Sequence, residues 1–329
     1  MIETFLATLT PILTLFVCIA IGFTVRKTNI VGRDAGKTVS KLVTWVFCPS
    51  LNFITMASNF TVDTLSTHGI NLTLSIFGVA VALIIAIPLS KVFVKENSPE
   101  RGIYAYALAF ANNGYMGDPL VLMILGEQAF AFYKLFTLPI NTVIYSWGMA
   151  QLVPKNAQKG SFLKNLINAP LVAMLAGMAF GITGLGAYLP EFFRNSLDTL
   201  KVCMGPGAML VAGFTIANYP IKDMLTKGKV YVATLLRLTL IPAVVIGAVF
   251  LAKTALASIL GITISNNPLY LLFFASASAI GLNTVVFPEA YGGDPKTGAS
   301  MAMISHTLAV LTIPIMYALL TYLFGPAVF

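Results

Sequence analysis

A polar stretch, Asn112–Pro119, interrupts an apolar segment that covers about residues 103–125. It contains two amides, two glycines, a carboxylate and a proline. Gly117 and Pro119 weaken a helix, and proline also removes a backbone donor. Broken backbone at membrane depth is tolerated where protein or a wet cavity surrounds it, and many secondary transporters bind solutes at such breaks. We therefore predict a solute site here, with helix breaks at Gly117 and Pro119. A simple proline kink is the alternative.

A second polar interruption lies in the apolar segment 268–291, where we expect helix breaks at Gly281 and Pro288. It contains Asn283 and Thr284. An amide can donate to a carboxylate while helix N-termini turn their positive ends toward it. Asn112 and Asn283 are therefore the leading candidates to bind an anion. Their neighbours Asn113 and Thr284 are further candidates, and amides that join two helices are the alternative.

Other polar residues inside apolar segments could complete the site. Ser50 and Asn52 follow a mid-segment proline, and Asn141 and Tyr145 share a helix face at i, i+4 spacing. We predict that these four side chains line the cavity. Contacts between neighbouring helices are an equal alternative.

Asp118 is an ionisable residue within a span, which makes it a candidate for function. It is a coupling candidate: the hypothesis is that it takes up a proton or Na⁺ and couples it to anion movement. The interpretation that the sequence favours is an N-cap for a second half-helix that begins at Pro119, since Asp-Pro suits that role, and the two roles are compatible. Lys134 is expected near the membrane surface, and Arg237 is expected to extend toward the cytoplasmic end of its span. The alternatives for Arg237 are that it attracts anions or balances a buried acid.

Composition restricts the class of protein. The chain has 329 residues, 57% of them hydrophobic and 10% charged, with a mean hydropathy of +0.86. Soluble proteins carry about 25% charged residues, so this is a polytopic membrane protein. Its net charge of +8 does not indicate nucleic acid binding, because the basic residues lie in short loops. Three scattered cysteines and two distant histidines predict no metal site, and we expect no cofactor beyond a coupled proton or Na⁺.

Apolar windows of about 20 residues predict ten spans. They lie at 4–25, 38–58, 71–94, 101–125, 128–152, 163–184, 195–218, 229–252, 268–291 and 297–324. Of the 20 basic residues, 15 fall in the loops after the odd-numbered spans, which places those loops in the cytoplasm and both termini outside. We predict two five-helix repeats, residues 1–153 and 163–329, joined by a cytoplasmic linker at 154–162. Because each repeat has an odd number of spans, the second is inverted, and the discontinuous helices 4 and 9 cross.

The first polar stretch also matches a family signature. Asn112, Met116, Gly117, Pro119 and Leu120 form the pattern N-x-x-x-M-G-x-P-L. The second half adds Asn283, Val285–Phe287, the run Tyr291–Asp294, Thr312 and Pro314. In these residues the chain resembles the auxin efflux carrier family, which includes plant PIN-type auxin exporters and bacterial carriers of malate, malonate and similar acids. It departs from the family by lacking a proline at Ala279 or Thr284, and by having Asp118 where plant members are apolar.

The resemblance implies a scaffold of helices 1, 2, 6 and 7 and a transport part of helices 3–5 and 8–10 that moves against it. It also implies a homodimer formed through the scaffold. We therefore expect a secondary active transporter, surrounded by membrane lipid, that moves a small organic anion across the cytoplasmic membrane by alternating access. The alternative is a sodium- or proton-coupled carrier of the bile-acid-symporter or cation-antiporter type. The sequence has no H-E-x-x-H, G-x-S-x-G or P-loop motif, so we expect neither an enzyme nor an ATP-driven pump.

Overall fold

A computed structural model describes residues 1–153, 168–291 and 293–329. The predicted linker at 154–162 lies outside the described residues, as does Gly292 of the Tyr291–Asp294 run. The described part is helical, and its β-type pairing consists of an isolated bridge between Ala111 and Ile280. This agrees with the predicted all-α class.

The first half of the chain forms long helices with short π-helical turns inserted. The elements are α1 (Ile2–Lys27), α2 (Ala35–Leu42), the π turn η1 (Val43–Phe47), α3 (Cys48–Asn59), the 3₁₀ turn η2 (Val62–Thr64), α4 (Leu65–Phe93), α5 (Pro99–Ala109), the π turn η3 (Asn113–Gly117), α6 (Asp118–Val143), the π turn η4 (Ile144–Gly148) and α7 (Met149–Leu152). Such turns are frequent at functional sites.

The second half repeats this helical character. Its elements are α9 (Ala169–Ile182), the 3₁₀ turn η6 (Leu185–Tyr188), α10 (Glu191–Val202), α11 (Met204–Ala217), α12 (Ile221–Leu225), α13 (Gly228–Leu238), α14 (Leu240–Leu260), α15 (Asn267–Ala277), α16 (Asn283–Tyr291) and α17 (Lys296–Phe324).

Seven helices within the described ranges are long and apolar enough to cross a membrane, and α9 and α15 are shorter apolar helices. On α4, Phe77 and Ile84 are exposed at seven-residue spacing, which places them on one face of the helix. An outward apolar face of this kind suits contact with lipid. Together these features fit a multi-pass membrane protein.

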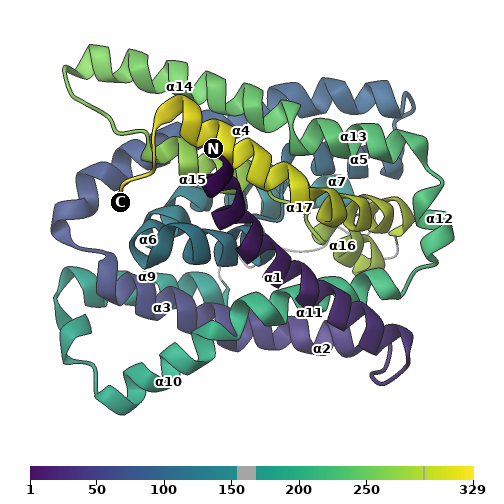
Figure 1. The fold of residues 1–329 in the computed structure, drawn as a ribbon, viewed down its shortest axis with the longest axis horizontal. Coiled ribbons are helices and arrows are strands. Elements are labelled where there is room, and N and C mark those ends of the chain that lie inside the picture. The colour runs from purple at the N-terminus through teal and green to yellow at the C-terminus, as the bar shows by residue number, and fades with distance from the viewer. Residues whose placement is uncertain (154–167, 292) are drawn as a thin grey trace.

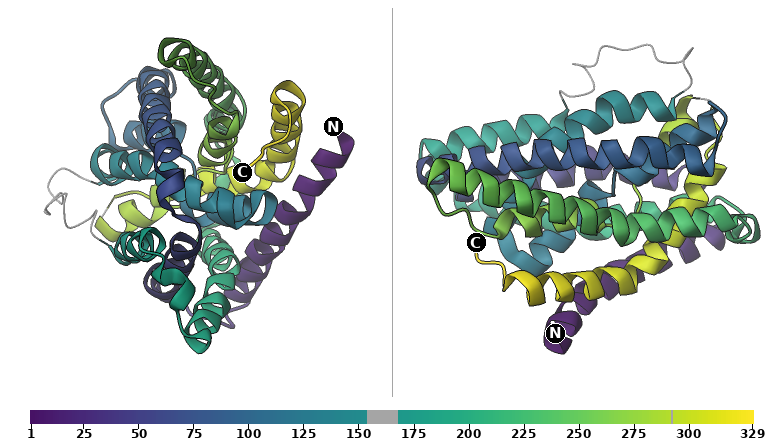
Figure 2. Two further views of the ribbon diagram at one scale, coloured as in Figure 1. Left: turned by 90° about the vertical axis from the view of Figure 1, so that its left-hand side faces the viewer. Right: turned by 90° about the horizontal axis from the view of Figure 1, so that it is seen from above.

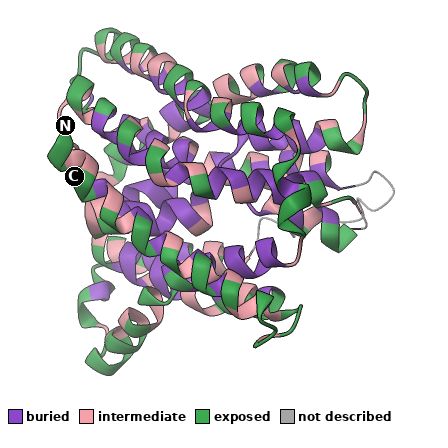
Figure 3. Cartoon of the chain, turned by 45° about the vertical axis from the view of Figure 1, so that its right-hand side comes forward, coloured by how far each residue is buried: buried purple, intermediate pink, exposed green. Residues whose placement is uncertain are grey.

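The interrupted helices lie in the middle of the molecule. In Figure 1, α4, α13 and α14 lie along one side and α2, α3, α9, α10 and α11 along the other, with α5, α6, α15 and α16 between them. Figure 2 shows α1 and the last helix leaning out on the side where both termini lie. Buried residues are concentrated in the central helices, and exposed residues on the outer ones (Figure 3). The broken segments are therefore enclosed by packed helices.

Glycines allow close packing on the side of α1, α3, α9 and α11. A Cβ at Gly213 of α11 would lie 2.2 Å from the carbonyl oxygen of Ile19, and one at Gly177 of α9 would lie 2.5 Å from that of Phe53. Backbones approach this closely only at small residues, a common basis of helix contact in membranes. The pairs α1–α11 and α3–α9 are therefore closely packed through these glycines.

Two helices are interrupted, and the interruptions face each other. Helix α5 ends at Ala109 and helical backbone resumes at Asn113, while α15 ends at Ala277 and α16 begins at Asn283. Ala111 and Ile280 form the antiparallel bridge, and the backbone N–H of Asn112 donates to the Ala279 carbonyl at 2.7 Å. The backbone N–H of Asn112 thus finds its partner in the other break, while the backbone N–H of Ile280 donates to the Ser305 hydroxyl of α17 at 3.0 Å.

The breaks differ from the predicted ones in position. Gly281 lies in the second break, but Gly117 lies within η3, Pro119 in the first turn of α6, and Pro288 within α16. Proline is well tolerated in the first turn of a helix, where its missing N–H has no intrahelical acceptor. Pro119 therefore follows the break rather than making it.

Candidate functional site

Two helix N-termini meet at the paired breaks. Asn112 caps η3, its side-chain oxygen accepting from the Tyr115 backbone N–H at 3.3 Å, and Asn283 is the first residue of α16. Helix N-termini carry a partial positive charge and free N–H groups. The pairing therefore gathers two anion-attracting ends around Ala111 and Ile280.

Asn112 is 7% exposed and is held by His306 of α17. Its Nδ2 lies 3.5 Å from Nε2 of His306, whose Nδ1 lies 2.7 Å from the Ala302 carbonyl. A carbonyl can only accept, so Nδ1 carries the proton, and in the neutral ring Nε2 accepts from Asn112. Sequence reasoning assigned no specific role to His306, although a histidine inside a span was a signal.

Asn113 and Asn141, two of the candidate amides, contact each other directly. Nδ2 of Asn113 donates to Oδ1 of Asn141 at 3.0 Å. The Tyr133 hydroxyl of α6 donates to the Asn113 carbonyl at 2.9 Å. Tyr133, which the sequence analysis did not single out, thereby holds the start of η3 against α6.

Asn283 contacts Tyr106 of α5, another residue that the sequence analysis missed. Its Nδ2 donates to the Tyr106 hydroxyl oxygen at 2.8 Å, joining α16 to the first broken helix. Its neighbour Thr284 is fully buried, and its hydroxyl donates to the Gly281 carbonyl at 2.8 Å. Thr284 therefore stabilises the start of α16, and Asn283 is the better placed to reach a ligand.

Tyr145 and Tyr115 lie around the same region. Tyr145 belongs to η4 and is half-buried, with its ring centroid 6.4 Å from that of Phe287 on α16. The Tyr115 hydroxyl lies 2.9 Å from the Ser40 hydroxyl of α2. Polar and aromatic side chains thus connect the breaks to η4 and to α2.

The structure does not bring Ser50 and Asn52 to this cluster. The Ser50 hydroxyl donates to the Val46 carbonyl of η1, four residues earlier, at 2.8 Å, and Nδ2 of Asn52 donates to the Pro170 carbonyl of α9 at 3.0 Å. Ser50 instead borders a hollow of about 290 Å³ lined by residues of η1, α3, α9 and α10. Both side chains therefore make their contacts among η1, α3 and α9, away from the paired breaks.

Asp118 and Lys134 form a buried ion pair. Nζ of Lys134 lies 2.8 Å from Oδ2 of Asp118, and the two residues are 8% and 1% exposed. The expectation of Lys134 near the surface was therefore wrong. The N-cap alternative for Asp118 also fails, because the helix already begins at Asn113, Asn112 provides the cap, and Asp118 has helical dihedral angles.

Arg237 differs from its expected position as well. It is 1% exposed at the end of α13, and its Nη1 donates to the Ser276 carbonyl in the last turn of α15. The side chain points inward instead of extending to the cytoplasmic end. In the described residues no group of three His, Cys, Asp or Glu could hold a metal ion.

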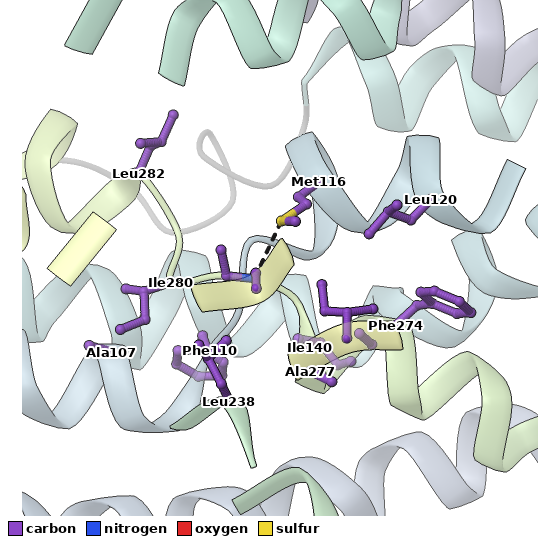
Figure 4. Packing of buried hydrophobic residues seen from close by; sticks show 14 of the residues in the cluster. Ala107, Phe110, Met116, Leu120, Ile140, Leu238, Phe274, Ala277, Ile280 and Leu282 are labelled. Atoms are coloured by element: carbon purple, nitrogen blue, oxygen red, sulfur yellow. Dashed lines mark hydrogen bonds between the residues drawn. The ribbon is translucent and has the colours of Figure 1, made fainter. Parts of the chain in front are cut away.

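Apolar side chains surround the bridge between Ala111 and Ile280. Figure 4 shows Met116, Ile280 and Phe110 around the second broken segment, with the Met116 sulfur 3.5 Å from the Ala279 backbone nitrogen. Low-polarity surroundings strengthen the few polar contacts that a bound solute can make. The amides of Asn112 and Asn283 are therefore well placed for recognition.

Known proteins show the same pattern along most of the chain. The model of the family described as membrane transport protein matches residues 7–161 and 154–317. The chain belongs to this family of auxin efflux carriers. An uncharacterized transporter of Methanocaldococcus jannaschii is 22% identical over 308 residues, covering 92% of this chain and 95% of the relative. Family membership indicates a transporter rather than an enzyme.

Proposed function

We propose that this protein is a secondary active transporter that moves a small organic anion across the cytoplasmic membrane by alternating access. The observation that supports it is the meeting of two helix N-termini, with Asn112 and Asn283, at the bridge between Ala111 and Ile280. Interrupted helices with such ends at mid-membrane bind solutes in many transporters.

The substrate is a carboxylate such as malate, malonate or an auxin-like acid. Each side-chain amide nitrogen carries two N–H groups. Asn112 uses one toward His306, and Asn283 uses one toward Tyr106. The second N–H of each is available to a carboxylate, and the helix N-termini favour the same charge. Asn113, Asn141 and Tyr145 line the approach.

The membrane architecture is a pair of inverted five-helix repeats with ten spans, in which discontinuous helices 4 and 9 cross. Span 4 combines α5 with the first part of α6, and span 9 combines α15 with α16. The left-handed backbone of Gly126 (φ 88°) within α6 supports a division between spans 4 and 5. Both termini lie outside, as the distribution of basic residues predicts.

Movement takes place between two groups of helices. The scaffold consists of spans 1, 2, 6 and 7, which contain the glycine contacts of Gly213 and Gly177, and it forms the homodimer. The transport part consists of spans 3–5 and 8–10, which carry both breaks. Tyr115 reaches Ser40 across the boundary between the two groups, so this contact has to change during each cycle.

Coupling operates through Asp118. A proton or Na⁺ that binds the carboxylate competes with Lys134 for it, so uptake of the cation releases the ammonium group from its 2.8 Å contact. The same observation favours the second candidate function, a sodium- or proton-coupled carrier of the bile-acid-symporter or cation-antiporter type. In that case cation movement is obligatory, and the organic substrate is of another class.

The test is uptake of labelled mono- and dicarboxylates into proteoliposomes under imposed pH and Na⁺ gradients. We expect saturable uptake that Asn112→Ala and Asn283→Ala reduce at least tenfold, because each loses a charge-assisted hydrogen bond. Asn59→Ala is the matched control: Asn59 donates to the Thr55 carbonyl of its own helix, on the scaffold side. Native protein that moves none of these acids under any gradient would exclude the anion function. Cation flux in the same vesicles would then support the second candidate.

A further inference from the structure

Arg237 carries a buried positive charge that no carboxylate neutralises in the described part of the chain. Three ion pairs occur there, and Arg237 takes part in none of them. Its Nη1 donates to the Ser276 carbonyl, but its Nε is buried without a hydrogen-bond partner among the described residues. An uncompensated buried charge costs several kcal/mol. The position therefore calls for a compensating negative charge.

Two hydroxyl groups beside Arg237 also lack partners. Thr234 lies one helical turn earlier on the same face of α13, and Ser276 provides the carbonyl that Arg237 binds. Both hydroxyl oxygens are buried without a hydrogen bond in the described structure. One guanidinium N–H and two hydroxyls can all donate to a single anion.

A capping role for Arg237 explains only part of this arrangement. A cation at the C-terminal end of α15 offsets roughly half a negative charge of that helix. This accounts for the contact of Nη1, but not for Nε or for the two hydroxyls. The other buried cations are better compensated: Lys134 pairs with Asp118, and Lys253 donates to the Ile264 and Ser265 carbonyls and to Oδ1 of Asn266.

This group lies next to the paired breaks. Ser276 lies three residues before Ala279, whose carbonyl accepts from the backbone N–H of Asn112. In Figure 4, Leu238, the neighbour of Arg237, lies beside Phe110 and Ala277. The unpartnered donors therefore lie on the α13 side of the second broken segment.

We propose that Arg237, Thr234 and Ser276 form an anion subsite that binds a carboxylate of the transported solute. This rests on the proposed function and extends it. The donors are covered in this conformation, so the carboxylate reaches them when α13 and α15 separate. Asp118 and Lys134 cancel each other, so the charge around the breaks is +1 when empty and neutral when one carboxylate is bound.

The test is thermal unfolding of the purified full chain in detergent, titrated with malate, acetate or chloride. We expect carboxylates to raise the midpoint of native protein in a concentration-dependent manner. Arg237→Gln abolishes this rise and does not lower the midpoint of ligand-free protein, because an unpaired charge is removed. Thr234→Val keeps the side-chain shape and weakens carboxylate binding about tenfold.

Arg194→Gln is the matched control. The Arg194 guanidinium also donates to a single backbone carbonyl, that of Gly186 at 2.6 Å, but it does so on α10 of the scaffold. We expect this variant to keep the native response to carboxylates. If Arg237→Gln does not fold, Arg237→Lys is used instead, because it retains the positive charge and loses the planar guanidinium group. A tenfold loss of carboxylate affinity in Arg237→Lys then supports the subsite.

Native carboxylate affinity in Arg237→Gln or Arg237→Lys would overturn the proposal. Stabilisation by chloride alone, lost in Arg237→Gln, would also overturn the assignment to a carboxylate and leave a site for an inorganic anion.

The proposed transport function is tested separately from the subsite. If Asn112→Ala abolishes uptake while Arg237→Gln keeps the native KM, the subsite is wrong and the carrier stands. If native protein moves no acid, the proposed transport of organic anions is wrong. The subsite is then judged only by whether carboxylates raise the unfolding midpoint of native protein and not that of Arg237→Gln.

Discussion

Nζ of Lys134 lies 2.8 Å from Oδ2 of Asp118, in the interior and on the same helix, α6. The two residues are 16 positions apart, so they meet because α6 turns back on itself at Gly126, where φ is 88°. A left-handed backbone of this kind favours glycine. The turn thus brings the first residue of α6 beside its second part, and with it a carboxylate beside an ammonium group.

Removing either charge should destabilise the protein. Asp118→Asn and Lys134→Met each leave one unpaired charge in the interior, which costs about 3–5 kcal/mol. The double variant Asp118→Asn/Lys134→Met should recover most of that loss, because no charge is left without a partner. Thermal unfolding of the three purified variants measures the effect. Additive losses in the double variant would show that the two groups do not depend on each other.

The proposed coupling role of Asp118 can be tested with the Asp118→Asn variant. If a proton or Na⁺ competes with Lys134 for the carboxylate, Asp118→Asn should abolish the dependence of uptake on the imposed gradient while some downhill uptake remains. Uptake into proteoliposomes with and without pH and Na⁺ gradients measures this dependence. An unchanged gradient response in Asp118→Asn would exclude coupling at this residue.

The sequence predicted the class of fold because apolar windows and sparse charge are local properties. It also located both polar interruptions, since Asn112 and Asn283 stand out inside apolar segments. It misplaced the first break because proline was taken as its cause. In the structure Pro119 starts α6, while the break is held by the pairing of Ala111 with Ile280. Such a contact between distant segments leaves no local pattern.

The partners of the candidate residues were hidden for the same reason. Tyr106, Tyr133 and His306 contact Asn283, Asn113 and Asn112 across 177, 20 and 194 positions of sequence. Periodicity within one helix cannot show which residues of another helix face it. The expectation for Lys134 failed for the same reason. Its position in a span does not reveal that the bend at Gly126 brings the Asp118 carboxylate beside it.

Tyr106 should act through Asn283. Tyr106→Phe removes the hydroxyl that accepts from Nδ2 of Asn283 at 2.8 Å, so the amide loses one fixed orientation. A neutral hydrogen bond contributes about 1 kcal/mol, so we expect about a fivefold rise in the KM for the acid with an unchanged maximal rate. Uptake kinetics measure both values. A native KM in Tyr106→Phe would show that this contact does not position Asn283.

His306 should orient Asn112. With Nδ1 donating to the Ala302 carbonyl at 2.7 Å, Nε2 is the acceptor for the Asn112 amide. His306→Gln offers a carbonyl oxygen in place of Nε2, whereas His306→Leu offers no acceptor. We expect His306→Leu to raise the KM about tenfold, and His306→Gln to restore much of the affinity. Equal KM values in the two variants would mean that the ring only fills space.

Gly117 should tolerate no side chain, because Tyr133 lies against it. A Cβ at Gly117 would lie 2.2 Å from the Tyr133 hydroxyl oxygen and 3.2 Å from the Phe274 carbonyl oxygen. Overpacking of this kind costs about 1–3 kcal/mol, so Gly117→Ala should lower the unfolding midpoint. Gly114→Ala is the matched control within η3, since a Cβ there meets nothing within 4 Å. Adding Tyr133→Phe removes the clashing oxygen and should recover part of the loss in Gly117→Ala. If Gly114→Ala and Gly117→Ala shift the midpoint equally, the cost comes from the π turn itself and not from the contact with Tyr133.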